Sequence, residues 1–173
     1  MTAHLAAFFL AAITLLSLSS GLAGPSGLAT NAPAAIELGD QYGVARRLTF
    51  PATKLTVITI ADRKGSDQVD GWIEALTSRY DGRIDLRGIA NLAGAPGFVH
   101  DRIRKKFQEK HKHPVMMDWS GGVCDQLGNT PGLANIIIVG SGGEIRGRFA
   151  GAAVQPLLGK VITALDQALL PKP

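Results

Sequence analysis

The sequence predicts an α/β domain, because apolar residues recur in alternation with the spacing of strands and of helices. The clearest change of period lies in residues 55–76, where a β-branched apolar run is followed by the polar or glycine residues 62–67 and then by apolar residues at helical spacing. Residues 134–139, ANIIIV, are the most apolar stretch of strand character, and we expect a fully buried strand there. Residues 154–170 carry an apolar face at helical spacing and are expected to form the last helix.

The elements between these landmarks follow from the same two periods. Residues 36–50 contain isolated apolar positions separated by glycine and charge, so we expect an irregular lead-in with one short strand at most. The turn GSGG at residues 140–143 is expected to join the buried strand to its neighbour in a hairpin. The remaining expected elements are a strand at 84–89, a basic amphipathic helix at 98–110, a strand at 114–119, a short helix at 122–127 and a strand at 144–149.

Composition limits the function classes. The 173 residues are 46% hydrophobic and 18% charged, which is typical of a folded globular domain. The net charge of +4 makes the surface mildly basic, but no basic patch with interleaved aromatic residues is visible, so we expect no nucleic-acid partner. The basic helix at 98–110 is interpreted as a solvated face, with a docking surface for an acidic protein or for membrane headgroups as the alternative.

The N-terminal segment predicts export. Residues 5–18 are uncharged and mostly apolar, and small residues follow them at Gly21 and Ala23, as at a signal-peptidase site. An uncleaved membrane anchor is the alternative, although the apolar run is shorter than the roughly 20 residues of a spanning helix. We therefore predict a signal peptide at 1–23, a flexible linker at 24–35 with a later cleavage alternative inside it, and one domain at 36–173. The mature protein is expected in the periplasm without a stable membrane span.

Three segments carry a resemblance to a known superfamily: LTVITIA at 55–61, PVMMDWSGGVCDQLG at 114–128 and IIIVGSGGEI at 136–145. Together with the order of elements, they resemble the thioredoxin-like superfamily, and more narrowly its redoxin branch of exported thiol-disulfide oxidoreductases and peroxiredoxin-like proteins. The resemblance spans about residues 36–170. It implies a central mixed β-sheet flanked by helices.

The chain departs from that superfamily at the positions that carry its chemistry. The resemblance places the two cysteines of the family's C-x-x-C motif near Lys64 and Asp67, and neither residue carries sulfur. It places the family's cis-proline at Ala134, whereas Pro131 lies three residues too early. Because thiol exchange needs a thiolate nucleophile and a resolving thiol, these departures indicate a degenerate active site that has lost dithiol redox chemistry.

The single cysteine, Cys124, excludes an intramolecular disulfide and is the one remaining thiol candidate. The alternative function is therefore a single-cysteine thiol oxidoreductase or peroxidase of the redoxin type. Val123 and Leu127 flank Cys124 at packing spacing, and no basic residue adjoins it to stabilise a thiolate. We therefore expect a small buried residue and assign no catalytic residue, and Cys124 is the one candidate for that role.

The histidines do not form a convincing metal site. His111 and His113 are two residues apart, so they could chelate a cation only from an extended segment, and Lys112 between them opposes a cation. Together with His100 and Cys124 they could form a metal cluster, but we interpret their segment as a solvated turn between helix and strand. We expect neither a metal nor another cofactor.

The favoured function is that of a binding or accessory protein built on the lost active site. The expected binding residues are Asp62, Arg63, Lys64, Asp67 and Trp119. Asp67 is also expected to cap the helix that begins near Gln68. Another periplasmic protein is the partner that this location favours.

Overall fold

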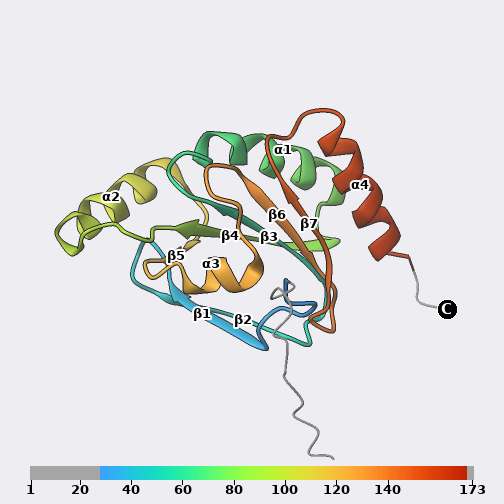
Figure 1. Cartoon of the computed structure of the whole chain (residues 1–173), viewed down its shortest axis with the longest axis horizontal. Coiled ribbons are helices and arrows are strands. Elements are labelled where there is room, and N and C mark those ends of the chain that lie inside the picture. Colours follow the sequence, from blue (N-terminus) through green and yellow to red (C-terminus); the bar gives the residue numbers. More distant parts are fainter. Residues whose placement is uncertain (1–27, 171–173) are drawn as a thin grey trace, which may run out of the picture.

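A computed structural model describes residues 28–170, in which a mixed five-stranded sheet separates two layers (Figure 1). The strand order is β5-β4-β3-β6-β7; β3, β4 and β5 run parallel, whereas β6 is antiparallel to both β3 and β7. The strands are β3 (Leu55–Ala61), β4 (Ile84–Asn91), β5 (Val115–Asp118), β6 (Asn135–Val139) and β7 (Ile145–Ala150). The predicted α/β class and the predicted hairpin of the last two strands are confirmed.

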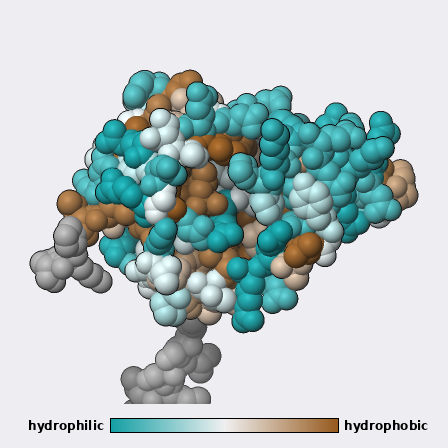
Figure 2. Space-filling model, turned by 180° about the vertical axis from the view of Figure 1, so that it is seen from behind, coloured by the Kyte–Doolittle hydropathy of each residue, from teal (hydrophilic) through white to brown (hydrophobic). Residues whose placement is uncertain are grey.

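The helices cover both faces of this sheet (Figure 1). They are α1 (Val69–Tyr80), α2 (His100–Lys110), α3 (Gly122–Leu127) and α4 (Leu157–Ala168), with 3₁₀ turns η1 (Ser66–Gln68) and η2 (Gly97–Val99) before the first two. The last helix is shorter than expected, since it begins at Leu157. Figure 2 shows the α2 end of the molecule, on the right, covered mainly by hydrophilic residues, as its basic sequence predicts.

Consecutive side chains of the central strand β3 point to opposite faces of the sheet. Six of its seven residues are buried, so β3 is covered on both faces. Val57 packs in the cluster of α1 and α4, which includes Trp72. Ile58 packs on the other face, in the cluster that includes Cys124 of α3. All five residues of β6 are buried, which confirms the fully buried strand that its apolar run predicted.

A β-hairpin forms where the sequence suggested an irregular lead-in with at most one strand, so that expectation is wrong. Strands β1 (Ala35–Gly39) and β2 (Ala45–Thr49) pair antiparallel, with the buried residues Ile36 and Leu48 opposite each other. Asp40 closes the hairpin, because its Oδ1 accepts hydrogen bonds from the backbone N–H groups of Tyr42 and Val44. Few apolar residues mark these strands because only alternate positions face the core.

Part of the predicted linker is attached to the domain. The Ala32 N–H donates to the Gly143 carbonyl at 2.8 Å, and the Ile145 N–H donates to the Thr30 carbonyl at 2.8 Å. The predicted signal peptide at 1–23 and the first residues of the linker lie outside the described residues. Within residues 28–170, no helix is both long enough and apolar enough to cross a membrane.

Candidate functional site

The turn after β3 is organised by the carboxylate of Asp62. Its Oδ1 accepts hydrogen bonds from the backbone N–H groups of Lys64 and Gly65, both at 2.9 Å. Its Oδ2 accepts the N–H of Gly132 at 2.7 Å, from the loop before β6. Burial alone would raise the pKa of Asp62, but these backbone donors outweigh it and hold the pKa below its usual value. Asp62 thus shapes the turn and fastens it to a distant loop.

The turn and the loop before β6 are in direct contact at Gly65. A Cβ at position 65 would lie 2.4 Å from the carbonyl carbon and oxygen of Leu133, so only glycine fits. Nearby, Gln68 Oε1 accepts the N–H of Ala134 at 3.2 Å. The two segments where the chain departs from the thioredoxin-like pattern, around Lys64 and at Ala134, therefore lie side by side.

The predicted helix cap by Asp67 is wrong. No side chain makes a capping hydrogen bond at the start of η1 or of α1, and Asp67 is exposed. The chain enters the helix through the 3₁₀ turn, so Asp67 lies inside the first turn and not at the capping position. Asp62 accepts the amides of Lys64 and Gly65 instead.

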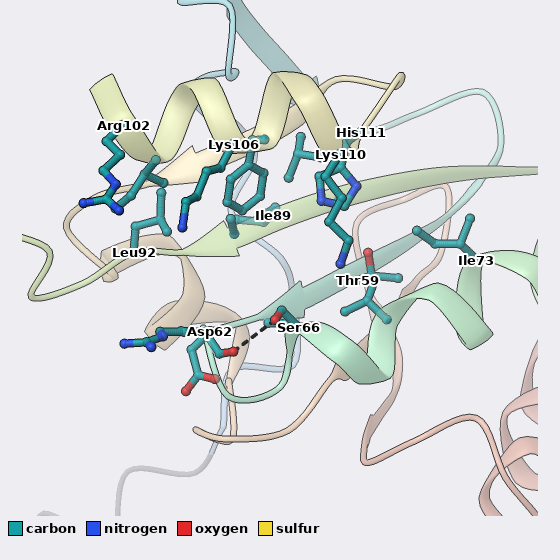
Figure 3. A pocket seen from close by; sticks show the side chains of 18 of the residues that line it. Thr59, Asp62, Ser66, Ile73, Ile89, Leu92, Arg102, Lys106, Lys110 and His111 are labelled. Carbon is teal, nitrogen blue, oxygen red and sulfur yellow. Dashed lines mark hydrogen bonds between the residues drawn. The ribbon is translucent and has the colours of Figure 1, made fainter. Parts of the chain in front are cut away.

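A cavity of about 590 Å³ lies between α1 and α2 above β3 and β4 (Figure 3). It exists because the strand residues on this face are small, so they leave space between the two helices. Its floor is formed by Thr59, Gly88, Ala90 and Val115. A Cβ at Gly88 would meet Thr59 Oγ1 at 3.7 Å and the methyl carbons of Val115 at 3.8 and 4.0 Å, which are ordinary contacts, so a side-chain carbon is accepted at this position of the floor.

The walls of the cavity are apolar. Helix α1 contributes Val69 and Ile73, and the α2 segment contributes Val99, Ile103 and Phe107. The sequence predicted an amphipathic α2, and the apolar side of that helix faces the cavity. The apolar side chains of α2 therefore border the cavity and are not packed directly on the sheet.

Four basic side chains border the same cavity: Arg63, Arg102, Lys106 and Lys110. Figure 3 shows the side chains of Arg102, Lys106 and Lys110 on the side of α2 that faces the cavity. Lys110 Nζ lies 3.7 Å from the Asp70 carboxylate. Within residues 28–170, the other three basic groups have no carboxylate partner within 4.0 Å. The opening thus carries unpaired positive charge.

The structure divides the predicted binding residues. Asp62 and Arg63 line the cavity, whereas Lys64 and Asp67 are exposed and do not. Trp119 is also outside the lining; its ring stacks on His100 with centroids 3.8 Å apart. Sequence reasoning missed the α2 cations as site residues, although the charge of that helix was visible. It also missed the floor of the cavity, which two small residues of β4, Gly88 and Ala90, could have indicated.

Cys124 is fully buried in α3, on the sheet face opposite α1, which confirms the expectation of a packed residue. Burial raises the pKa of its thiol, and the nearby carboxylate of Asp118 raises it further. Asp118 Oδ2 accepts the Cys124 N–H at 3.0 Å at the start of the helix. No group of three or more His, Cys, Asp or Glu side chains among residues 28–170 is placed to hold a metal ion.

Solved structures of low sequence identity share this architecture. An uncharacterized conserved protein from Geobacillus kaustophilus is similar with a TM-score of 0.61 and 17% identity, over 84% of this chain and 86% of its own. The pneumococcal exposed lipoprotein thioredoxin Etrx1 from Streptococcus pneumoniae has a TM-score of 0.57 and 13% identity, over 75% and 98%. A thiol:disulfide interchange protein of the thioredoxin family from Chlorobium tepidum has a TM-score of 0.55 and 12% identity, over 82% and 97%.

No protein-family model matches the chain, and no curated protein matches its sequence. The structural likeness rests on the mixed central sheet and its flanking helices, which the resemblance in sequence had predicted. The chain contains one cysteine and therefore has no C-x-x-C pair. This protein has the thioredoxin-like fold.

Proposed function

We propose that this is an exported thioredoxin-fold protein that has lost dithiol redox chemistry and acts as a binding or accessory protein. The observation that supports this most is the separation of sulfur from the turn after β3. Lys64 and Asp67 occupy that turn, while the only cysteine sulfur is buried on the opposite face of the sheet.

Thiol chemistry at Cys124 is disfavoured by its surroundings. A thiol attacks a disulfide or a peroxide as the thiolate, and the attacking sulfur must be reachable. Cys124 is fully buried, and burial together with Asp118 keeps its thiol protonated. These features support the binding role over the alternative of a single-cysteine oxidoreductase or peroxidase.

The binding role has two candidate surfaces around one turn. Asp62 and Arg63 face the cavity, which has the size and the apolar lining of a small-ligand site. Lys64 and Asp67 are exposed beside it and could contact another periplasmic protein. Arg63, Lys64 and Asp67 are exposed, and the carboxylate that accepts the backbone amides of the turn is that of Asp62, so these three charges are available for recognition.

The loss of redox chemistry is tested by two activity assays on the purified domain. We expect no reduction of insulin disulfides with a dithiol donor, and no peroxide consumption beyond that of the Cys124→Ser variant. Peroxide turnover in the wild type that Cys124→Ser abolishes would overturn the proposal and support the oxidoreductase alternative.

The accessory role is tested with the double variant Arg63→Ala/Lys64→Ala. Both side chains are exposed, so the free energy of unfolding should change by no more than about 0.5 kcal/mol. We expect this variant to lose capture of a periplasmic partner identified by mass spectrometry with the wild type as bait. The matched control is Lys105→Ala/Lys112→Ala, which removes two exposed charges elsewhere. Unchanged capture by the double variant would refute a role of this turn in protein binding.

A further inference from the structure

We propose that the cavity between α1 and α2 binds a single-chain anionic amphiphile. The ligand class is that of medium-chain fatty acids taken up from solution. The inference rests on the proposed binding function and gives it a ligand class. The apolar interior of the cavity would hold the chain, and the basic opening would hold the anionic head.

The interior has the size and polarity that an alkyl chain needs. A volume of about 590 Å³ lies within the range of small-molecule sites, roughly 300–1,000 Å³. Two helices and the sheet surround it, with Ile73 on one side and Ile103 and Phe107 on the other. Each methylene group that leaves water for such a lining raises affinity about fourfold. Chain length should therefore control binding.

The charge at the opening selects an anion. Arg63 comes from the turn after β3, whereas Arg102 and Lys106 come from α2, so basic side chains from two separate elements line the cavity. Within the described residues none of these three groups has a carboxylate within 4.0 Å. A guanidinium group binds a carboxylate through two parallel hydrogen bonds, which fits the head of a fatty acid.

The one carboxylate that lines the cavity is outnumbered there by the four basic side chains. Asp62 accepts three backbone N–H groups, so both of its oxygens are engaged by the turn and by the loop before β6. His111 also lines the cavity, and burial followed by the charge of Lys110 lowers its pKa, so it stays neutral at pH 7. The lining therefore presents a positive opening above an apolar interior.

The ligand test is titration calorimetry of the full domain with three probes, each below its solubility limit and below any concentration at which it forms micelles. Dodecanoate should bind to one site per chain. Dodecan-1-ol, with the same chain and no charge, should bind at least tenfold more weakly. Hexanoate, with the same head and a shorter chain, should also bind at least tenfold more weakly. Equal affinity for dodecan-1-ol would overturn recognition of the anion.

Two kinds of variant locate the site. Lys106→Glu should weaken dodecanoate at least tenfold, whereas its neighbour Lys105→Glu, exposed on the same helix and outside the lining, should bind as the wild type does. Gly88→Leu should fill the floor and abolish binding, with circular dichroism to confirm its fold. If that variant fails to fold, the comparison of the two lysine variants still decides the site. Equal loss in both lysine variants would overturn the proposed location.

The outcomes separate this inference from the function on which it rests. Absence of dodecanoate binding by a folded wild type would overturn the ligand class and leave the redox assays to judge the proposed function. Dodecanoate binding together with peroxide turnover at Cys124 would retain the ligand site and overturn the proposed loss of redox chemistry.

Discussion

The Asp62 carboxylate accepts the backbone N–H of Gly132 at 2.7 Å, and this bond joins the turn after β3 to the loop before β6 across 70 residues of sequence. In the superfamily that the sequence resembles, these are the segments of the cysteine pair and of the cis-proline. Here a carboxylate and backbone groups hold them together. The contact helps to hold the shape of a turn that contains no cysteine.

The first prediction is that Asp62→Ala lowers the free energy of unfolding by about 1–3 kcal/mol, because three backbone N–H groups lose their acceptor. Urea unfolding followed by circular dichroism measures it. Asp67→Ala is the matched control in the same turn; its side chain caps nothing, so its effect should stay within about 0.5 kcal/mol. Equal losses in the two variants would contradict the assignment of the structural role to Asp62.

A second prediction concerns the close approach at Gly65. Gly65→Ala should cost about 1–3 kcal/mol of unfolding free energy, because the new Cβ would lie 2.4 Å from backbone atoms of Leu133, which cannot move aside as a side chain can. Gly97→Ala serves as the control, since nothing lies within 4 Å of a Cβ there. Thermal unfolding of both variants decides the matter, and a neutral Gly65→Ala would show that the turn and the loop separate readily.

In acid, we expect stability to fall below about pH 4. Asp40, Asp62 and Asp118 all have pKa values lowered from the ordinary value of 3.8, since the hydrogen bonds that they accept outweigh their burial. A lowered folded-state pKa means that the stabilisation is present above the unfolded value and is lost as pH falls through the folded value. Urea midpoints measured from pH 7 to pH 2.5 test this. Asp62→Asn should show a shallower decline, and a parallel decline would contradict the role of Asp62.

In alkali, the buried thiol should make the free energy of unfolding fall as pH rises, the opposite of the dependence expected in acid. The pKa of Cys124 is raised above its ordinary value of 9.0 by burial and by Asp118, so its contribution is complete below pH 9 and is lost as pH rises further. Tyr80, whose pKa is also raised by burial, contributes in the same direction, so the comparison is between variants. Cys124→Ala should flatten the decline of the urea midpoint above pH 9. In the same samples at pH 8, an aromatic disulfide reagent should label Cys124 only after unfolding.

For export, we predict a mature protein that begins near Gly24. The later site, near Ala35, would remove residues 30–32, which pair with the turn before β7. Intact-mass spectrometry of the periplasmic fraction of a Gram-negative expression host gives the first residue directly. Recovery of Met1-containing protein in the membrane fraction would instead support the uncleaved anchor.

Much of the fold was predictable because its signals are local. The change of period across residues 62–67 marks β3 and α1, and the run at 134–139 marks β6, since neighbouring side chains alone decide these periods. The β1–β2 hairpin was not predictable in this way. Ile36 and Leu48 become a buried pair only when two strands lie side by side.

The sequence by itself determined the α/β order, the absence of a cysteine pair and the basic character of α2, because composition and period need no knowledge of distant contacts. Only the tertiary structure decided what Asp62, Asp67 and Gly88 do. The acceptor of the Gly132 amide, the missing helix cap and the open floor beneath α2 each depend on which segments the fold brings together. The candidate site therefore depends on tertiary contacts, whereas the fold class follows from the local pattern of apolar residues along the sequence.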